Sequence, residues 1–227
     1  MSTLQFTGFT PATIQFFKDL KSNNNKPWFD AHKPVYVSEI LNRMKTLIVA
    51  LTPAMQSIDP KFDFNPNKIL SRIYRDIRFS PDKTPYKTHL WMTFQRFIPD
   101  GQWESFPAFF MEISEEGYDY GMGLYGSKKK IIDNLRERII DEPDHFREIT
   151  EPVLKRGFNP EGETYKKPVK NDLPEYFQPW FNYKYAYVIK TCPVGKEMFS
   201  EKFAEILADD FLTMKPFYEF LVDACDI

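Results

Sequence analysis

The groups most capable of chemistry in this chain are concentrated between Lys68 and His89. This stretch holds six Lys or Arg residues against two acids, a local excess of +4 in a chain whose net charge is −2. The six bases are Lys68, Arg72, Arg75, Arg78, Lys83 and Lys87, and the two acids are Asp76 and Asp82. Because a guanidinium group forms a rigid fork that matches planar oxyanions, we expect this segment to bind a small molecule that carries phosphate or carboxylate.

Side-chain alternation predicts which of these groups share a face. If the segment is extended, it has two faces, which hold Arg72, Tyr74, Asp76 and Arg78 on one side and Ile73, Arg75, Ile77 and Phe79 on the other. The second face is apolar apart from Arg75, and an arginine is almost never fully buried without a partner. Arg75 therefore needs a carboxylate, a set of carbonyl groups or a bound anion.

The residue types also suggest a division of roles. The expected ligand-binding residues are Arg72, Arg75, Arg78, Tyr86 and Lys87, with Asn24, Asn25 and Trp28 as a wall or lid of the site. The candidates for catalytic proton or metal chemistry are Asp76, Lys83 and His89. The alternative is an internal ion-pair network, in which the two acids hold the arginines and no ligand enters.

The run from Arg72 to Lys87 reads R-x-x-R-D-x-R-F-S-x-D-K-x-P-Y-K. It resembles the defining motif of the bacterial and fungal family called domain of unknown function 2461. The elements Asn24-Asn25-Lys26-Pro27-Trp28-Phe29 and Gly121-Met122-Gly123 are similar to that family as well, so the resemblance covers nearly the whole chain. It implies that the motif positions are Arg72, Arg75, Asp76, Arg78, Phe79, Asp82, Lys83 and Tyr86, and it implies no reaction. A later family segment that ends in a D-H-P triplet is replaced here by Asn171-Asp172-Leu173-Pro174, which lacks the histidine.

Two further patterns suggest phosphate binding only weakly. The G-x-G-x-x-G run from Gly121 to Gly126 follows a hairpin pattern rather than the strand of a βαβ unit, so we expect no nucleotide fold. Lys128, Lys129 and Lys130 lie in the first turn of a predicted helix, where the helix dipole disfavours cations. They form either an anion cradle or a solvated helix end, and the second interpretation is favoured.

The acids and cysteines outside this region indicate neither a metal site nor a disulfide framework. Glu197, Glu201, Glu205 and Asp209 recur every four residues, which is typical of a solvated helical face. Cys192 and Cys225 lack any C-x-x-C or histidine-rich context. We therefore expect no metal centre, and the sequence names no cofactor.

The apolar pattern predicts one α+β domain over residues 1–227, a mainly antiparallel sheet flanked by N-terminal and C-terminal helices. Thr10-Pro11 marks a helix start, and a second helix is expected to begin near Pro34. Three or four strands are expected between Ile69 and Tyr125. The expected segments are helical 10–57, strand-rich 69–125, helical 127–142, irregular 152–182, a strand at 183–191 and helical 197–225.

Composition and charge indicate which classes of protein this chain can belong to. The chain has 227 residues, of which 42% are hydrophobic, which is enough for a full hydrophobic core without support from disulfide bonds or a bound metal. Its N-terminus lacks a signal pattern and no apolar run reaches membrane length, so we expect a cytoplasmic protein. Nearly balanced charge disfavours membrane and nucleic-acid partners.

Three functions follow from these patterns. The first is a small anionic-ligand site, enzymatic or sensory, built on the Arg72 to His89 motif. The second is a non-catalytic interaction domain in which the motif is a structural ion-pair network. The third is a nucleic-acid-binding module that uses Trp91, Phe94 and Phe97 for stacking. Because the motif names no reaction, whether the protein is an enzyme stays open at this stage, as does its oligomeric state.

Overall fold

The first part of the chain is helical. The computed structural model describes residues 5–78, 81–96, 106–126, 128–185 and 187–225. Its first helices are α1 (Pro11–Ser22), α2 (Lys26–Val35), the π-helical turn η1 (Tyr36–Leu41), α3 (Asn42–Ile58) and the short α4 (Pro66–Ile69). Thr10 caps α1 and Pro11 occupies its first turn, as predicted.

The second helix differs from the expected one at its start. It begins at Lys26 rather than near Pro34, because the Asn25 side chain caps it by accepting a hydrogen bond from the Trp28 amide at 3.0 Å. Pro34 lies inside the helix, and the π-helical turn follows directly after α2. The chain stays helical past the proline because Phe29, Tyr36 and Ile40 are all buried along this stretch, and their packing outweighs the lost backbone hydrogen bond.

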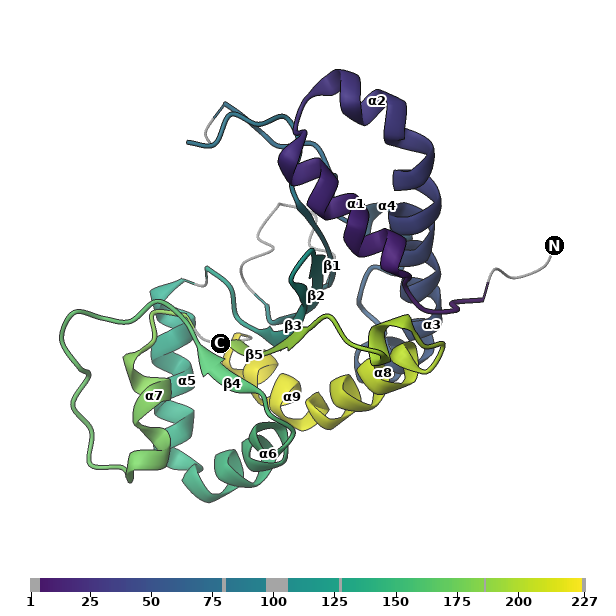
Figure 1. Cartoon of the computed structure of the whole chain (residues 1–227). Coiled ribbons are helices and arrows are strands. Elements are labelled where there is room, and N and C mark those ends of the chain that lie inside the picture. Colours follow the sequence, from purple (N-terminus) through teal and green to yellow (C-terminus); the bar gives the residue numbers. More distant parts are fainter. Residues whose placement is uncertain (1–4, 79–80, 97–105, 127, 186, 226–227) are drawn as a thin grey trace.

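Five antiparallel strands form one sheet in the order β1-β2-β3-β5-β4 (Figure 1). Their bounds are β1 (His89–Phe94), β2 (Ala108–Ser114), β3 (Gly117–Gly123), β4 (Asn159–Glu161) and β5 (Tyr187–Pro193). The predicted α+β class, with a mainly antiparallel sheet between N-terminal and C-terminal helices, is confirmed. The strand expected at 183–191 runs instead from 187 to 193, and β4 lies in the segment expected to be irregular. A three-residue edge strand is too short to show alternation.

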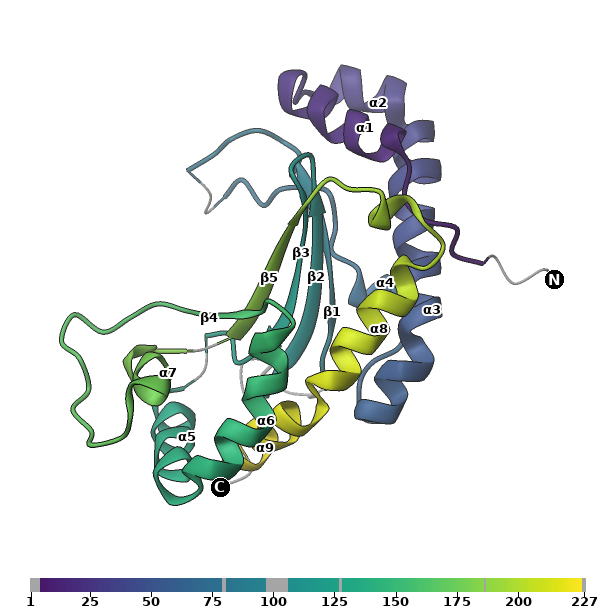
Figure 2. The same ribbon diagram turned by 60° about the horizontal axis from the view of Figure 1, so that its bottom comes forward.

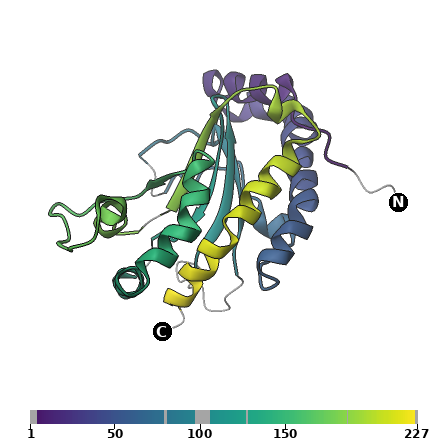
Figure 3. The same cartoon turned by 90° about the horizontal axis from the view of Figure 1, so that it is seen from below.

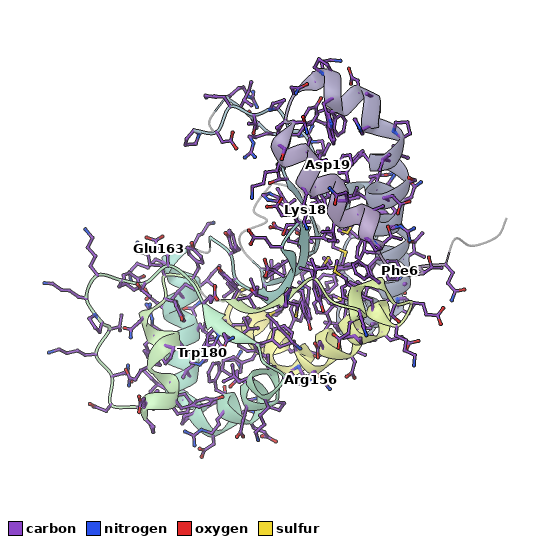
Figure 4. The ribbon with its side chains drawn as sticks, in the orientation of Figure 1. Phe6, Lys18, Asp19, Arg156, Glu163 and Trp180 are labelled. Carbon is purple, nitrogen blue, oxygen red and sulfur yellow. The ribbon has the colours of Figure 1, made fainter. Side chains whose placement is uncertain are left out.

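The remaining helices come after β3 in the chain, with β4 and β5 lying between them. They are α5 (Lys129–Asp141), α6 (Pro143–Lys155), α7 (Gln178–Asn182), α8 (Phe203–Thr213) and α9 (Lys215–Cys225), with short 3-10 turns η3 (Glu175–Phe177) and η4 (Glu197–Phe199). Trp180 of α7, labelled in Figure 4, is buried against Phe146 of α6 and Phe217 of α9. None of the helices in the described part of the chain combines the length and the apolar character that a membrane crossing requires.

Helices cover one face of the sheet and leave most of the other open. Figures 2 and 3 show α6, α8 and α9 lying across the same side, with α3 next to α8. On this side Phe109 of β2 packs against Phe211 of α8 and Tyr218 of α9, with ring centroids 5.2 and 5.4 Å apart. Because side chains alternate along a strand, the intervening residues of β1, β2 and β3 point to the opposite, less covered face.

Two buried carboxylates tie the helices to the sheet. Asp59 at the end of α3 accepts hydrogen bonds from Tyr218 of α9 and from Arg96 after β1, both at 2.6 Å. Asp210 of α8 accepts from Tyr120 of β3 and, at 2.7 Å, from Arg156. Arg156 lies just beyond α6, as Figure 4 shows. Both carboxylates therefore have the charged and hydroxyl partners that burial demands.

Candidate functional site

The predicted motif forms a narrow hairpin rather than a strand of the sheet. The Arg75 amide donates to the Pro85 carbonyl at 3.0 Å, and the Lys87 amide donates to the Ile73 carbonyl at 2.8 Å. These bonds define the 73–87 hairpin, which projects beyond α1 and α2 in Figure 1. Phe79 and Ser80, within its tip, lie outside the described residues.

Most charged groups of the 73–87 hairpin are paired within it. Arg78 binds both oxygens of Asp76 through Nε and Nη2 at 2.9 and 2.7 Å, and these hydrogen bonds lower the pKa of Asp76 to about 2. Arg75 meets the Asp82 carboxylate at 3.0 Å, which is one of the partners that its place on the apolar face requires. Lys83 donates to the Ile77 carbonyl at 2.7 Å.

The Asn24 side chain fastens the hairpin to the helices. Its amide nitrogen donates to the Tyr86 carbonyl at 2.9 Å, and its oxygen accepts from the Tyr86 amide at 3.1 Å. The Tyr86 ring is buried and stacks on Phe29 of α2 with centroids 4.1 Å apart. Trp28 stacks on His32 at 4.1 Å. Asn24, Asn25 and Trp28, expected as a wall or lid, thus support the hairpin and α2.

A cavity of about 820 Å³ lies on the less covered face of the sheet, and we call it the sheet cavity. In Figure 2 this face is flanked by the 73–87 hairpin at one end and by β4 and α7 at the other. Its charged lining residues are Lys68, Arg72, Asp76, Lys87, Glu112 and Asp119. Its aromatic lining residues are Tyr74, Trp91, Phe106, Phe110, Tyr125 and Tyr187.

The structure brings only part of the predicted site to this cavity. Arg72, Asp76 and Lys87 line it, whereas Arg75, Arg78 and Lys83 do not. The three arginines therefore do not converge on one point. The reason is geometric, since alternation turns Arg75 to the other face and the hairpin tip carries Arg78 away from the sheet.

Glu112 and Asp119 form a carboxyl pair on the cavity floor. They are directly opposite each other on β2 and β3, with Trp91 opposite Glu112 on β1. Opposite side chains on one face lie about 4.5–5.5 Å apart at Cβ, so the two carboxyls are neighbours. Oδ1 of Asp119 is buried and has no hydrogen-bond partner among the described residues.

Basic side chains surround this pair on the β1 side. Nδ1 of His89 lies 3.8 Å from Oε1 of Glu112. Lys87 lies over the Trp91 ring, 4.0 Å from its centroid, and donates to the Arg72 carbonyl at 3.1 Å. His89 is the one catalytic candidate from the sequence that touches the carboxyl pair.

Burial and like charges shift the ionisation of these groups. Burial, and then the nearby Asp119 carboxylate, raises the pKa of Glu112. Burial, followed by Lys87 and Arg75, lowers the pKa of His89. Burial, followed by Arg72 and Arg75, lowers the pKa of Lys87. Each shift disfavours the charged form of its group. Next to the sheet cavity, the uncharged imidazole of His89 is favoured, and Glu112 ionises at a higher pH than an ordinary glutamate.

Comparison with known families assigns the chain. A family model described as "Conserved hypothetical protein (DUF2461)" matches residues 12–220. The chain belongs to this family. Comparisons with curated proteins and with solved structures find no significant match. Membership of DUF2461 confirms the resemblance that the sequence indicated, and its description names no activity.

The site residues that we predicted from the sequence of this DUF2461 chain did not include Glu112 and Asp119. The signal that would have found them is the register of the β2–β3 hairpin. A two-residue turn at Glu115 and Glu116 places Ile113 opposite Tyr118 and Glu112 opposite Asp119. Since Ile113 and Tyr118 belong to the core face, the two acids must share the other face.

The glycine and lysine patterns have structural explanations. Gly121 lies in β3, where a Cβ would come within 1.9 Å of the Val188 carbonyl oxygen. Lys128, Lys129 and Lys130 are exposed at the start of α5 and do not line the sheet cavity. Ser127 lies outside the described residues.

The acids near the C-terminus share no single helical face. Glu197 lies in the turn η4, before α8 begins, and Asp209 of α8 pairs with Arg156 at 2.6 Å. Within the described residues, no group of three or more His, Cys, Asp or Glu side chains is placed to hold a metal ion.

Proposed function

We propose that the sheet cavity binds a small molecule that carries a phosphate or carboxylate group, and that Arg72 and Lys87 hold this group. The observation that carries the proposal is the position of Arg72 on the cavity wall and its lack of an ion pair in the described part of the chain. It lines the cavity and makes no ion pair within the described residues, whereas Arg75 and Arg78 both have carboxylate partners. A guanidinium group without a carboxylate at a cavity wall is a natural oxyanion partner.

Lys87 adds a second positive charge beside Arg72. Its ammonium group donates to the Arg72 carbonyl and lies over the Trp91 ring, contacts that leave its charge uncompensated by an acid within hydrogen-bond distance among the described residues. Repulsion from Arg72 helps to lower its pKa, after burial. An anion between the two cations would relieve this repulsion, so binding is expected to favour the protonated form of Lys87.

The far wall of the cavity suits an apolar or ring-shaped part of the ligand. Tyr187 contacts Phe110 and Tyr125, with centroids 6.1 and 5.6 Å apart. Between them Ala108 is opposite Gly123, so no large side chain rises from the floor at that point. A cavity with an aromatic wall and a few polar groups has the usual composition of a small-molecule site.

The structural interpretation of the motif applies to its other half. The pairs Arg75–Asp82 and Arg78–Asp76 stabilise the 73–87 hairpin from within, and the hydrogen bonds of Asn24 hold it against the helices. We infer that the motif serves both purposes, with Arg75 and Arg78 shaping the hairpin that presents Arg72 and Lys87 to the cavity.

The nucleic-acid hypothesis finds less support. Phe94, one of its three stacking residues, is fully buried on the helix-covered side of the sheet. Lys87 lies over the Trp91 ring, and Phe97 lies outside the described residues. A stacking platform needs exposed rings, which the described members of this set do not offer.

Thermal unfolding with a panel of anions tests the proposal. The panel contains inorganic phosphate, nucleotides, sugar phosphates and dicarboxylates. A ligand at one hundred times its Kd should stabilise the protein by about 2.7 kcal/mol. We expect this gain to disappear in Arg72→Ala and to persist in Arg147→Ala, a matched control on α6 whose side chain is exposed on the opposite side of the sheet.

Arg78→Ala separates this proposal from convergence of all three arginines. We expect it to keep the response to ligand, because Arg78 does not line the sheet cavity. If no member of the panel stabilises the wild type, or if Arg72→Ala responds as the wild type does, the proposed anion site is wrong.

A further inference from the structure

The Glu112–Asp119 pair lies in the same cavity as the proposed anion site, but it repels anions. It lies in the row that crosses the sheet as Trp91, Glu112, Asp119 and Thr191. Two ionised carboxylates at this spacing repel each other and any anion next to them. The pair must therefore have a role other than holding the ligand's anionic group.

Burial and the nearby Asp119 raise the pKa of Glu112, so Glu112 keeps its proton to a higher pH than an ordinary glutamate does. The groups that face Glu112 are His89 of β1, Asp119 of β3 and Lys87 of the hairpin. Of these, Asp119 favours the proton on Glu112 and Lys87 opposes it.

The unpartnered oxygen of Asp119 shows that the pair lacks a donor. Oδ1 is buried without a hydrogen-bond partner among the described residues, which is costly for a carboxylate. A ligand group in the cavity that donates a hydrogen bond would satisfy this oxygen.

We propose that Glu112 and Asp119 together bind a hydroxyl group of the ligand, so that the sheet cavity takes a hydroxylated phosphate or carboxylate. The assignment rests on the proposed function for the anionic group. A hydroxyl donates as well as accepts, so it can donate to the buried Oδ1 of Asp119, which has no partner among the described residues. The ligand's anionic group lies at Arg72 and Lys87, and its hydroxyl lies on the floor.

Carbon-13 NMR titration of the ligand-free protein tests whether Asp119 acts on Glu112 as a close neighbour in the pair. We expect the side-chain carboxyl carbon of Glu112 to titrate above the usual range in the wild type and to move toward it in Asp119→Asn. Glu116→Gln, at the exposed turn between β2 and β3, is the matched control and should leave the titration of Glu112 unchanged. A Glu112 carbon that titrates in the usual range, or whose titration is unchanged in Asp119→Asn, overturns the pairing of the two carboxyl groups.

A matched pair of phosphates tests the hydroxyl. Glycerol 3-phosphate and propyl phosphate have the same carbon skeleton and differ by two hydroxyl groups. We expect the wild type to bind glycerol 3-phosphate with a Kd about tenfold lower, the equivalent of one hydrogen bond to a charged group. Glu112→Ala and Asp119→Ala, which have no side-chain donor or acceptor, should remove this preference and keep propyl phosphate binding, while Glu116→Gln should keep both.

The outcomes distinguish this inference from the proposed function. Equal binding of the two phosphates, lost in Arg72→Ala, supports the anion site and overturns the hydroxyl assignment. Binding of neither phosphate contradicts the ligand class assigned here, and the response to the wider anion panel then decides the anion site on its own.

Discussion

Glu112 makes the stability of the fold depend on pH. Its pKa is raised in the folded protein by burial and then by Asp119, so ionising it is harder in the folded state than in the unfolded chain. Stability is therefore expected to fall as pH rises from the unfolded pKa through the folded pKa.

Glu112→Gln should remove this loss. We expect the variant to be more stable than the wild type at pH 7, and the difference to shrink below the unfolded pKa of about 4.3. Urea unfolding at several pH values, with Glu116→Gln in parallel, measures it. A wild type that gains stability relative to Glu112→Gln as pH rises would contradict the raised pKa.

Arg75 illustrates how exposure limits the value of an ion pair. The Arg75 side chain is 20% exposed, but the side chain of its partner Asp82 is 49% exposed, so removing Arg75 leaves a carboxylate that water can solvate. Arg75→Met is therefore expected to cost at most about 1 kcal/mol, measured by urea unfolding. A loss of several kcal/mol would show that Arg75 supports the fold more strongly than its contacts indicate.

At the scale of elements, the decisive contact joins the α1–α2 turn to the 73–87 hairpin. Asn24 makes two hydrogen bonds to the backbone of Tyr86, a residue 62 positions away. Asn24→Ala leaves a buried amide and carbonyl without these partners, and it should cost about 1–3 kcal/mol.

The same change should loosen the hairpin. We expect trypsin to cut Asn24→Ala faster after Arg78 or Lys83 than it cuts the wild type. Ser22→Ala, at an exposed site on the last turn of α1, is the control. An unchanged cleavage rate together with unchanged unfolding would show that the Tyr86 ring alone holds the hairpin.

At the scale of the whole molecule, Asp59 joins α3, α9 and the end of β1. Burial raises the pKa of this carboxyl, but hydrogen bonds from Tyr218, the Lys61 amide and Arg96 outweigh burial and hold the pKa below its usual value. The stabilisation is therefore present above the unfolded pKa and is lost as pH falls through the folded pKa.

Asp59→Asn should break this junction. It removes the negative charge that Arg96 binds in a mostly buried position, so we expect a loss of about 3–5 kcal/mol at pH 7. Tyr218→Phe, which removes one hydrogen bond to the same carboxylate, should cost about 1.5–3 kcal/mol. Urea unfolding from pH 3 to pH 7 checks both, and a wild type that is no more acid-sensitive than Asp59→Asn would contradict the lowered pKa.

Local pattern was enough to predict elements such as α1 and β2 and the faces of their side chains. The cap at Thr10 and the alternation of Phe109, Met111 and Ile113 depend on residues close in sequence, and the structure has α1 and β2 where they indicated. Pro34 misled the helix prediction because proline's local effect was outweighed by burial of the residues after it.

The candidate site was decided by contacts between distant parts of the chain. Charge density indicated the Arg72 to His89 segment, but it did not show that Arg75 and Arg78 bind Asp82 and Asp76 while Arg72 lines a cavity. The carboxyl pair depends on strand register, and its ionisation depends on burial. Periodicity reports which face a side chain takes, whereas desolvation and the pairing of charges depend on what the folded chain brings next to that face.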